Sequence, residues 1–227
     1  MISPYAKWYT EKPDVAPGKP ISTEHSQRYT LRRRELAGRI LDFLLTPDGP
    51  DASFRGLAAA ASVTRPTLVH YFDDHQGAIC AAIALAGQRG SAHTDRLRAA
   101  ADTPPQQALA AILTEFAAAW TTSLGHFHRI GFRAGLSDAT VGRVYHDAIL
   151  DPTLRAFEDL LGAYHQRGTL CVPSPRDAAL TLFPPVLVAL FSQHQLGGAD
   201  SRPLDLDAFI VQHVSGFVRG HAADARK

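Results

Sequence analysis

One nine-residue run, TRPTLVHYF, carries side chains that could read a nucleic acid. Arg65 presents paired donors that match guanine O6 and N7, and Thr67 and His70 add further hydrogen-bonding groups. Leu68 and Phe72, four residues apart, would share one helix face and point into a core. The spacing therefore predicts a helix whose polar side meets base edges in a DNA major groove.

The residues just before this helix are suited to position it. Ser53 is a capping residue type ahead of a helix over residues 54–61, and Thr64 caps the next helix, with Pro66 in its first turn. Ser62 stands in the short turn between them, where the backbone needs a left-handed conformation that glycine usually supplies. This pattern predicts a helix-turn-helix, the second helix of which enters the groove.

Hydroxyl and cationic side chains nearby are expected to contact phosphates and set the register. Between Arg28 and Arg39 there are five arginines against Glu35 alone, a local charge of +4, although a solvated helix face is an alternative interpretation. Val69 could touch a thymine methyl. The predicted DNA-contacting residues are Arg32, Arg33, Arg55, Thr64, Arg65, Pro66, Thr67, Val69, His70, Tyr71 and His75.

Composition bounds the class of protein. The 227 residues, 45% of them hydrophobic and 20% charged, are enough for one or two domains with sizeable cores. The two cysteines lack metal-ligand spacing, and no apolar stretch reaches the roughly 20 residues that a membrane span needs. We expect a cytoplasmic protein without a metal, a cofactor or a membrane partner.

Enzyme motifs are missing from the sequence. It contains no nucleophile elbow, no glycine-rich phosphate loop and no His-Glu-x-x-His, and its 11 histidines are scattered. We therefore predict that the protein is not an enzyme.

Helical periodicity runs along the chain and no strand pattern competes with it. The predicted fold class is all-α, with an N-terminal three-helix helix-turn-helix domain and a C-terminal helical domain for ligand binding and dimerisation. A fourth helix, with Asp73 and Asp74 as capping candidates, is expected to run past Arg89 and to be weakened near Gly90, where we place a domain boundary. Asp205 is expected to cap the last helix, and a long apolar helix is expected to be kinked or broken at Pro184-Pro185. The predicted parts are a flexible basic, proline-rich arm (1–27), the DNA-binding domain (28–90) and the effector-binding and dimerisation domain (91–227).

Residues 39–86 resemble the DNA-binding domain of the TetR (tetracycline-repressor) family of transcriptional regulators. Gly56, Ser62, Val69 and His75 depart from the family pattern, His75 standing where a phosphate-contacting lysine is usual. The resemblance implies a repressor that binds a near-palindromic double-stranded DNA operator as a homodimer and is released by a small-molecule effector. The residues that carry it are Ile40, Leu41, Ser53, Leu57, Ala58, Ala61, Val63, Thr64, Thr67, Leu68, Tyr71 and Phe72.

The C-terminal domain offers aromatic side chains that could line an effector pocket, although taken singly each is better explained as part of the core. Four histidines could serve as polar handles: His126, His128, His146 and His165. The candidate ligand-binding residues are Phe116, Trp120, Phe127, Phe132, Tyr145, Tyr164 and Phe183.

The last two long helices are apolar around much of their circumference, which favours pairing with a second chain; packing inside one monomer is the alternative. The candidate dimer residues are Leu187, Leu190, Phe191, Phe209, Ile210, Val214 and Phe217. A second function also stays open, that of an all-α dimeric interaction protein with little sequence-specific DNA binding. Val69 and His75 are the residues that favour it.

Overall fold

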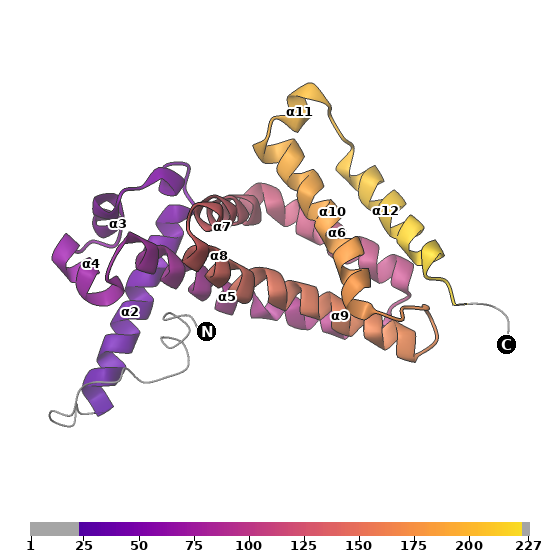
Figure 1. Ribbon diagram of the computed structural model, residues 1–227, viewed down its shortest axis with the longest axis horizontal. Helices are drawn as coiled ribbons and strands as arrows, with labels where there is room; N and C mark the ends of the chain where they lie inside the picture. Colours follow the sequence, from indigo (N-terminus) through magenta and orange to yellow (C-terminus); the bar gives the residue numbers. More distant parts are fainter. Residues whose placement is uncertain (1–22, 224–227) are drawn as a thin grey trace. The chain divides into compact units, whose positions relative to one another are not determined.

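The computed structural model describes residues 23–223, and within them the chain is helical, apart from short connections and one isolated bridge between Leu170 and Ala222 (Figure 1). The predicted all-α class is confirmed. Most of the predicted arm, residues 1–22, lies outside the described residues.

Packing divides the chain into two compact units, which are considered one at a time. The first runs to Ala86 and includes Ile130–Tyr145; the second comprises Gly87–Arg129 and the chain from His146 onward. These are packing units rather than functional assignments, so the three predicted functional parts remain a prediction.

The first unit is built on α2 (Thr23–Leu44), α3 (Phe54–Ala60) and α4 (Arg65–Phe72). The start of α5 (His75–Ala99), the end of α7 (Gly125–Ser137) and α8 (Ala139–Tyr145) complete it. Its core includes large side chains that are at most 2% exposed, among them Leu36, Ile40, Leu44, Leu57, Leu68 and Phe72.

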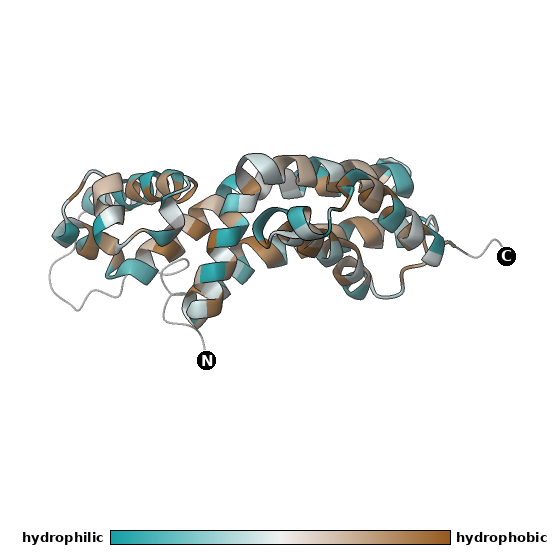
Figure 2. Cartoon of the chain, turned by 90° about the horizontal axis from the view of Figure 1, so that it is seen from above, coloured by the Kyte–Doolittle hydropathy of each residue, from teal (hydrophilic) through white to brown (hydrophobic). Residues whose placement is uncertain are grey.

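The second unit packs α10 (Pro175–Gln195) against α9 (Asp151–Gln166) and α12 (Leu206–Gly220), and α12 against α6 (Pro105–Ala119). Short π-helical turns, Trp120–Leu124 and His146–Leu150, follow α6 and α8, and α11 (Gly198–Ser201) follows α10. Figure 2 shows that most helices carry both hydrophilic and hydrophobic residues, as expected for elements with one buried face.

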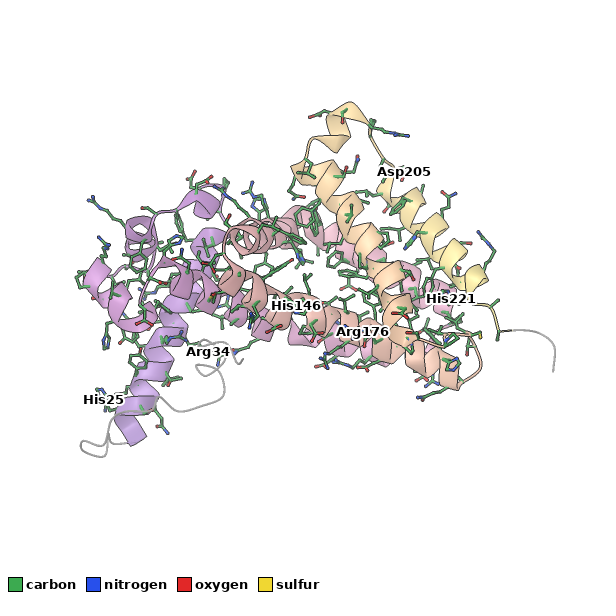
Figure 3. All side chains as sticks on the ribbon, in the orientation of Figure 1. His25, Arg34, His146, Arg176, Asp205 and His221 are labelled. Atoms are coloured by element: carbon green, nitrogen blue, oxygen red, sulfur yellow. The ribbon has the colours of Figure 1, made fainter. Side chains whose placement is uncertain are left out.

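The predicted helix caps are confirmed by hydrogen bonds. Ser53 Oγ accepts from Gly56 N–H at 3.2 Å, and Asp74 Oδ1 accepts from Gly77 N–H at 2.8 Å. Asp205 caps α12 in the same way, and Figure 3 labels it at the start of that helix.

One predicted limit is wrong. α2 begins at Thr23, so the last residues assigned to the arm are helical. α5 continues past Gly90 to Ala99, because Gly90 lies in open space while Leu97 is 1% exposed, and that burial offsets the roughly 1 kcal/mol that a helical glycine costs.

α10 is continuous from Pro175 to Gln195, so the break predicted as one outcome at its two prolines does not occur. Each proline removes an N–H that would bond the carbonyl four residues earlier, in this case those of Leu180 and Thr181. Both residues are exposed, so water can satisfy their carbonyls and the helix need not break.

Among the described residues no single helix is long and apolar enough to span a membrane; α6 and α7 meet that test only as a pair bent by 79°.

Candidate nucleic-acid interface

A tight turn joins α3 to α4. Ser62 has φ of 56°, the left-handed conformation that the sequence predicted, and Val63 N–H donates to Ala58 O at 3.0 Å. The chain therefore leaves α3 and enters α4 within a few residues. This is the helix-turn-helix geometry, and it is set by local hydrogen bonds.

α4 has one buried and one exposed face. Leu68 is completely buried, whereas Arg65, Pro66, Val69 and His70 are exposed. Arg65 and Val69, four residues apart, lie on the same side of the helix, and Val69 is 41% exposed despite its apolar side chain. The exposed face thus combines a guanidinium, an imidazole and a methyl-bearing side chain.

Two threonines cap the start of α4. Thr67 N–H donates to Thr64 Oγ1 at 3.3 Å, and the two hydroxyl oxygens lie 2.8 Å apart. One hydroxyl therefore donates to the other, and Thr64 Oγ1 also accepts from the backbone of the first turn. Arg55 is exposed near the start of α3.

His75 differs from the predicted phosphate contact. Its Nε2 lies 2.9 Å from Ala52 O, and its half-buried ring meets Phe54 edge-on. A carbonyl only accepts, so Nε2 carries the hydrogen and Nδ1 of the neutral ring is an acceptor. The ring joins the segment before α3 to the start of α5, and its Nε2–H is used in this contact.

The arginines of α2 are largely engaged within the chain. Arg32 pairs with Glu35 at 2.6 Å, and Arg39 pairs with the same carboxylate at 2.8 Å while donating to Ala61 O at 3.0 Å. Arg33 Nε donates to Tyr71 O at 3.0 Å. The sequence shows that Arg32 and Arg39 lie three and four residues from Glu35, a spacing that allows ion pairs on a helix. The contacts of Arg33 with α4 and of Arg39 with the end of α3 depend on tertiary packing.

Tyr29 is a residue that the sequence reasoning missed. Its ring stacks on Tyr71, with centroids 4.9 Å apart, and its hydroxyl donates to His70 O at 3.2 Å. Burial raises the pKa of the Tyr29 hydroxyl, although the neighbouring Arg33 charge opposes this shift. The predicted DNA contact Tyr71 is therefore half-buried under a second aromatic ring.

Most of the predicted ligand-binding aromatics lie in the second unit, at most 6% exposed; three of them contact His128, and a fourth, Phe183, packs on Phe116. The ring of His128 stacks on Trp120, with centroids 5.2 Å apart and planes 14° apart, and burial lowers its pKa to about 4. We name this group the His128 cluster: His128, Phe116, Trp120, Phe127 and Phe183.

The other candidates lie elsewhere. Tyr164 donates its hydroxyl to the carbonyls of Ala100 and Thr103, at 3.1 and 2.8 Å. Phe132 and Tyr145 pack against each other in the first unit, with centroids 5.4 Å apart.

The predicted dimer residues are mostly enclosed within the chain. Leu190, Ile210 and Val214 have no exposed surface, Leu187 and Phe217 are 6% and 7% exposed, and Phe191 and Phe209 are half-buried. The apolar residues that α10 and α12 do expose are Leu180, Val188 and Val211, at 44%, 66% and 55%. Periodicity did not separate the inner faces of these helices from their outer ones.

No protein-family model and no curated protein matches this sequence. Solved structures do resemble it. A protein from Mesorhizobium loti MAFF303099 assigned to the TetR family of transcriptional regulators is 16% identical, with a TM-score of 0.69 over 86% of this chain and 98% of that one.

Two further structures are similar. The flavonoid-responsive regulator FrrA is 18% identical, with a TM-score of 0.61 over 86% of this chain and 99% of its own. SmeT, the repressor of the Stenotrophomonas maltophilia multidrug efflux pump SmeDEF, is 16% identical, with a TM-score of 0.58 over 85% and 91%. The chain therefore has the fold of the TetR-family transcriptional regulators.

Proposed function

We propose that this protein is a DNA-binding transcriptional regulator that reads a near-palindromic operator in double-stranded DNA. The observation that carries the proposal is the capped helix-turn-helix, on which α4 exposes Arg65, Val69 and His70 opposite a buried Leu68. A helix presented in this way offers donors and an apolar contact to the major groove. Residues 28–90 would form the DNA-binding domain. The protein would act in the cytoplasm and would not be an enzyme.

The protein would bind as a homodimer. Leu180 and Val188 of α10 and Val211 of α12 are large apolar side chains that these helices expose. α10 and α12 pack against each other, so a second copy could cover both helices at once around a two-fold axis. Two-fold symmetry in the protein would then match a near-palindrome in the operator.

Repression and release by a small molecule complete the proposal, with residues 91–227 as the effector-binding part. SmeT is a repressor and FrrA responds to flavonoids, and both share this fold. The buried aromatic rings of the second unit would suit a small hydrophobic effector if the unit opens to admit it. Compounds that raise the melting temperature and release DNA would support this step; hits that stabilise the protein without releasing DNA would count against it.

The rival function is that of an all-α dimeric interaction protein with little sequence-specific DNA binding. The observations in its favour are that His75, Arg32 and Arg33 are engaged within the chain. Exposed Arg55 and Arg65 favour the regulator, because they leave charge for phosphates and bases.

The dependence of DNA affinity on salt separates the two functions. Fluorescence anisotropy with a mixed-sequence duplex would be recorded between about 50 and 200 mM salt. A regulator that neutralises several phosphates loses affinity steeply over this range, with a slope of about −0.9 per phosphate. An interaction protein would show a flat response, and that result would remove the proposed function.

A further inference from the structure

The short helix α4 depends on groups outside itself at its C-terminal end. It has only eight residues, and the last four carbonyls of any helix lack partners within the helix. Val69 O accepts from Asp73 N–H at 2.8 Å, and Phe72 O accepts from Asp74 N–H at 2.7 Å. The other two carbonyls, of His70 and Tyr71, receive their hydrogen bonds from α2.

Those two hydrogen bonds come from side chains one helical turn apart. The hydroxyl of Tyr29 donates to His70 O at 3.2 Å, and Arg33 Nε donates to Tyr71 O at 3.0 Å. The side chains also cover the rings at this end of the helix. Tyr29 stacks on Tyr71 and meets His70 edge-on, with centroids 5.6 Å apart, while the Arg33 guanidinium lies 5.2 Å from the centre of the Phe72 ring.

The backbone after α4 supplies the other two hydrogen bonds through a tight turn. Asp73 has φ of 64° and ψ of −59°, an uncommon conformation for a residue with a side chain, and it turns the chain sharply into α5. The positive charge of Arg33 is also favourably placed, because the C-terminus of a helix carries a partial negative charge.

We infer that Tyr29 and Arg33 are positioning residues for DNA binding: they hold the C-terminal end of α4 so that Arg65 and His70 face the groove. The inference rests on the proposed DNA-binding function. It reassigns Arg33, which the sequence predicted as a phosphate contact, and it gives Tyr29 a role. Together the two residues couple the arginine-rich start of α2 to the orientation of the reading helix.

The test compares three variants on the operator and on mixed-sequence duplex. Tyr29→Phe removes only the hydroxyl donor, and Arg33→Gln removes the guanidinium. Arg34→Gln is the matched control. Arg34 is the next residue along α2, its side chain is exposed, and its substitution removes the same charge as Arg33→Gln (Figure 3). Melting temperatures are recorded alongside, so that affinity is compared among folded proteins.

Tyr29→Phe and Arg33→Gln are expected to weaken operator binding by about threefold to tenfold each, the range for one lost hydrogen bond. Relative to Arg34→Gln, affinity for mixed-sequence DNA and the salt slope should stay unchanged, because no phosphate contact is lost. The inference is overturned if operator affinity stays at the wild-type value. It is also overturned if Arg33→Gln alone makes the slope shallower by about 0.9 and weakens both duplexes equally, which would identify a phosphate contact.

Hydrogen exchange without DNA separates this inference from the proposed function. The amides of Tyr71 to Asp74 should exchange faster in Tyr29→Phe than in the wild-type protein, because α4 then loses a restraint at its end. Faster exchange in a protein that binds no DNA would refute the proposed function, but it would still show that Tyr29 holds the end of α4. Unchanged exchange would refute the inference that Tyr29 holds the end of α4.

Discussion

At the scale of single residues, Arg65 is the side chain on which sequence reading depends most. It is exposed in the first turn of α4, and a bidentate arginine contact with guanine is worth about 1 to 3 kcal/mol. Arg65→Ala should therefore weaken operator binding by roughly 5-fold to 150-fold and relax the preference at one base pair. Anisotropy titrations on the operator and on single-base variants measure both effects.

Arg55→Ala is the control for that prediction. Arg55 is exposed at the start of α3 and is proposed to contact a phosphate, so its loss should weaken operator and mixed-sequence duplex about equally. Equal losses on both duplexes for Arg65→Ala would mean that Arg65 is not a base reader.

His128 makes stability depend on pH. Burial lowers its pKa to about 4, whereas in the unfolded chain it is about 6.5. As the pH falls from about 6.5 towards 4, the unfolded chain binds a proton that the folded chain does not, so folding loses about 3 kcal/mol. The contribution is fully present above pH 6.5.

Urea denaturation at pH 7 and pH 4.5 would measure this loss against His128→Phe, which keeps an aromatic ring but cannot titrate. The wild-type protein should lose about 2 kcal/mol more than the variant between these two conditions. An equal loss in both proteins would show that other groups control acid sensitivity.

Sequence could predict those residues whose role is local. Ser53, Thr64 and Asp205 cap helices because the donor that each one satisfies lies three residues further on. Tyr29 and Arg33 could not be recognised, since their acceptors lie 41 and 38 residues away and depend on how α2 crosses α4.

At the scale of elements, the turn between α3 and α4 contains a strained residue. Ser62 has φ of 56°, which costs a residue with a Cβ about 1 to 2 kcal/mol, while glycine loses about 0.5 to 1 kcal/mol through its freedom in the unfolded chain. Ser62→Gly should therefore raise the free energy of unfolding by about 0.5 to 1 kcal/mol, as measured by urea denaturation. Ser62→Ala is the control; an equal gain from alanine would show that strain is not the cause.

The exposed faces of α10 and α12 give a prediction about assembly. Val188→Lys would place a charge in the middle of the proposed apolar interface, twice per dimer, and should raise the dimer dissociation constant by at least about 100-fold. Sedimentation velocity over a range of concentrations measures this. Leu136→Lys, on an α7 residue that is 85% exposed, is the control and should leave the association unchanged.

If the wild-type protein and Val188→Lys sediment identically, the proposed interface is contradicted. Periodicity alone could not choose this face, because Leu190, Ile210 and Val214 look equally apolar in the sequence, and only packing shows that they are fully enclosed.

At the scale of the whole molecule, the fold was predictable because its most specific part is contiguous. The caps, the turn and the spacing of Leu68 and Phe72 all lie within about 20 residues, so the sequence could predict the helix-turn-helix without tertiary information. The contacts that join residues of α2, α3 and α4 could be recognised only from the structure. The fold is that of TetR-family regulators, and the proposed function adds DNA, a second copy and an effector to it.

Selection of bound sequences from random duplex DNA is the most direct test of the central claim. A two-fold dimer that presents two copies of α4 should enrich a near-palindromic sequence with half-sites about one helical turn apart, or a multiple of that spacing. The same selection with Arg65→Ala should lose the enrichment at one position of each half-site. Recovery of no enriched sequence from the wild-type protein would contradict the account.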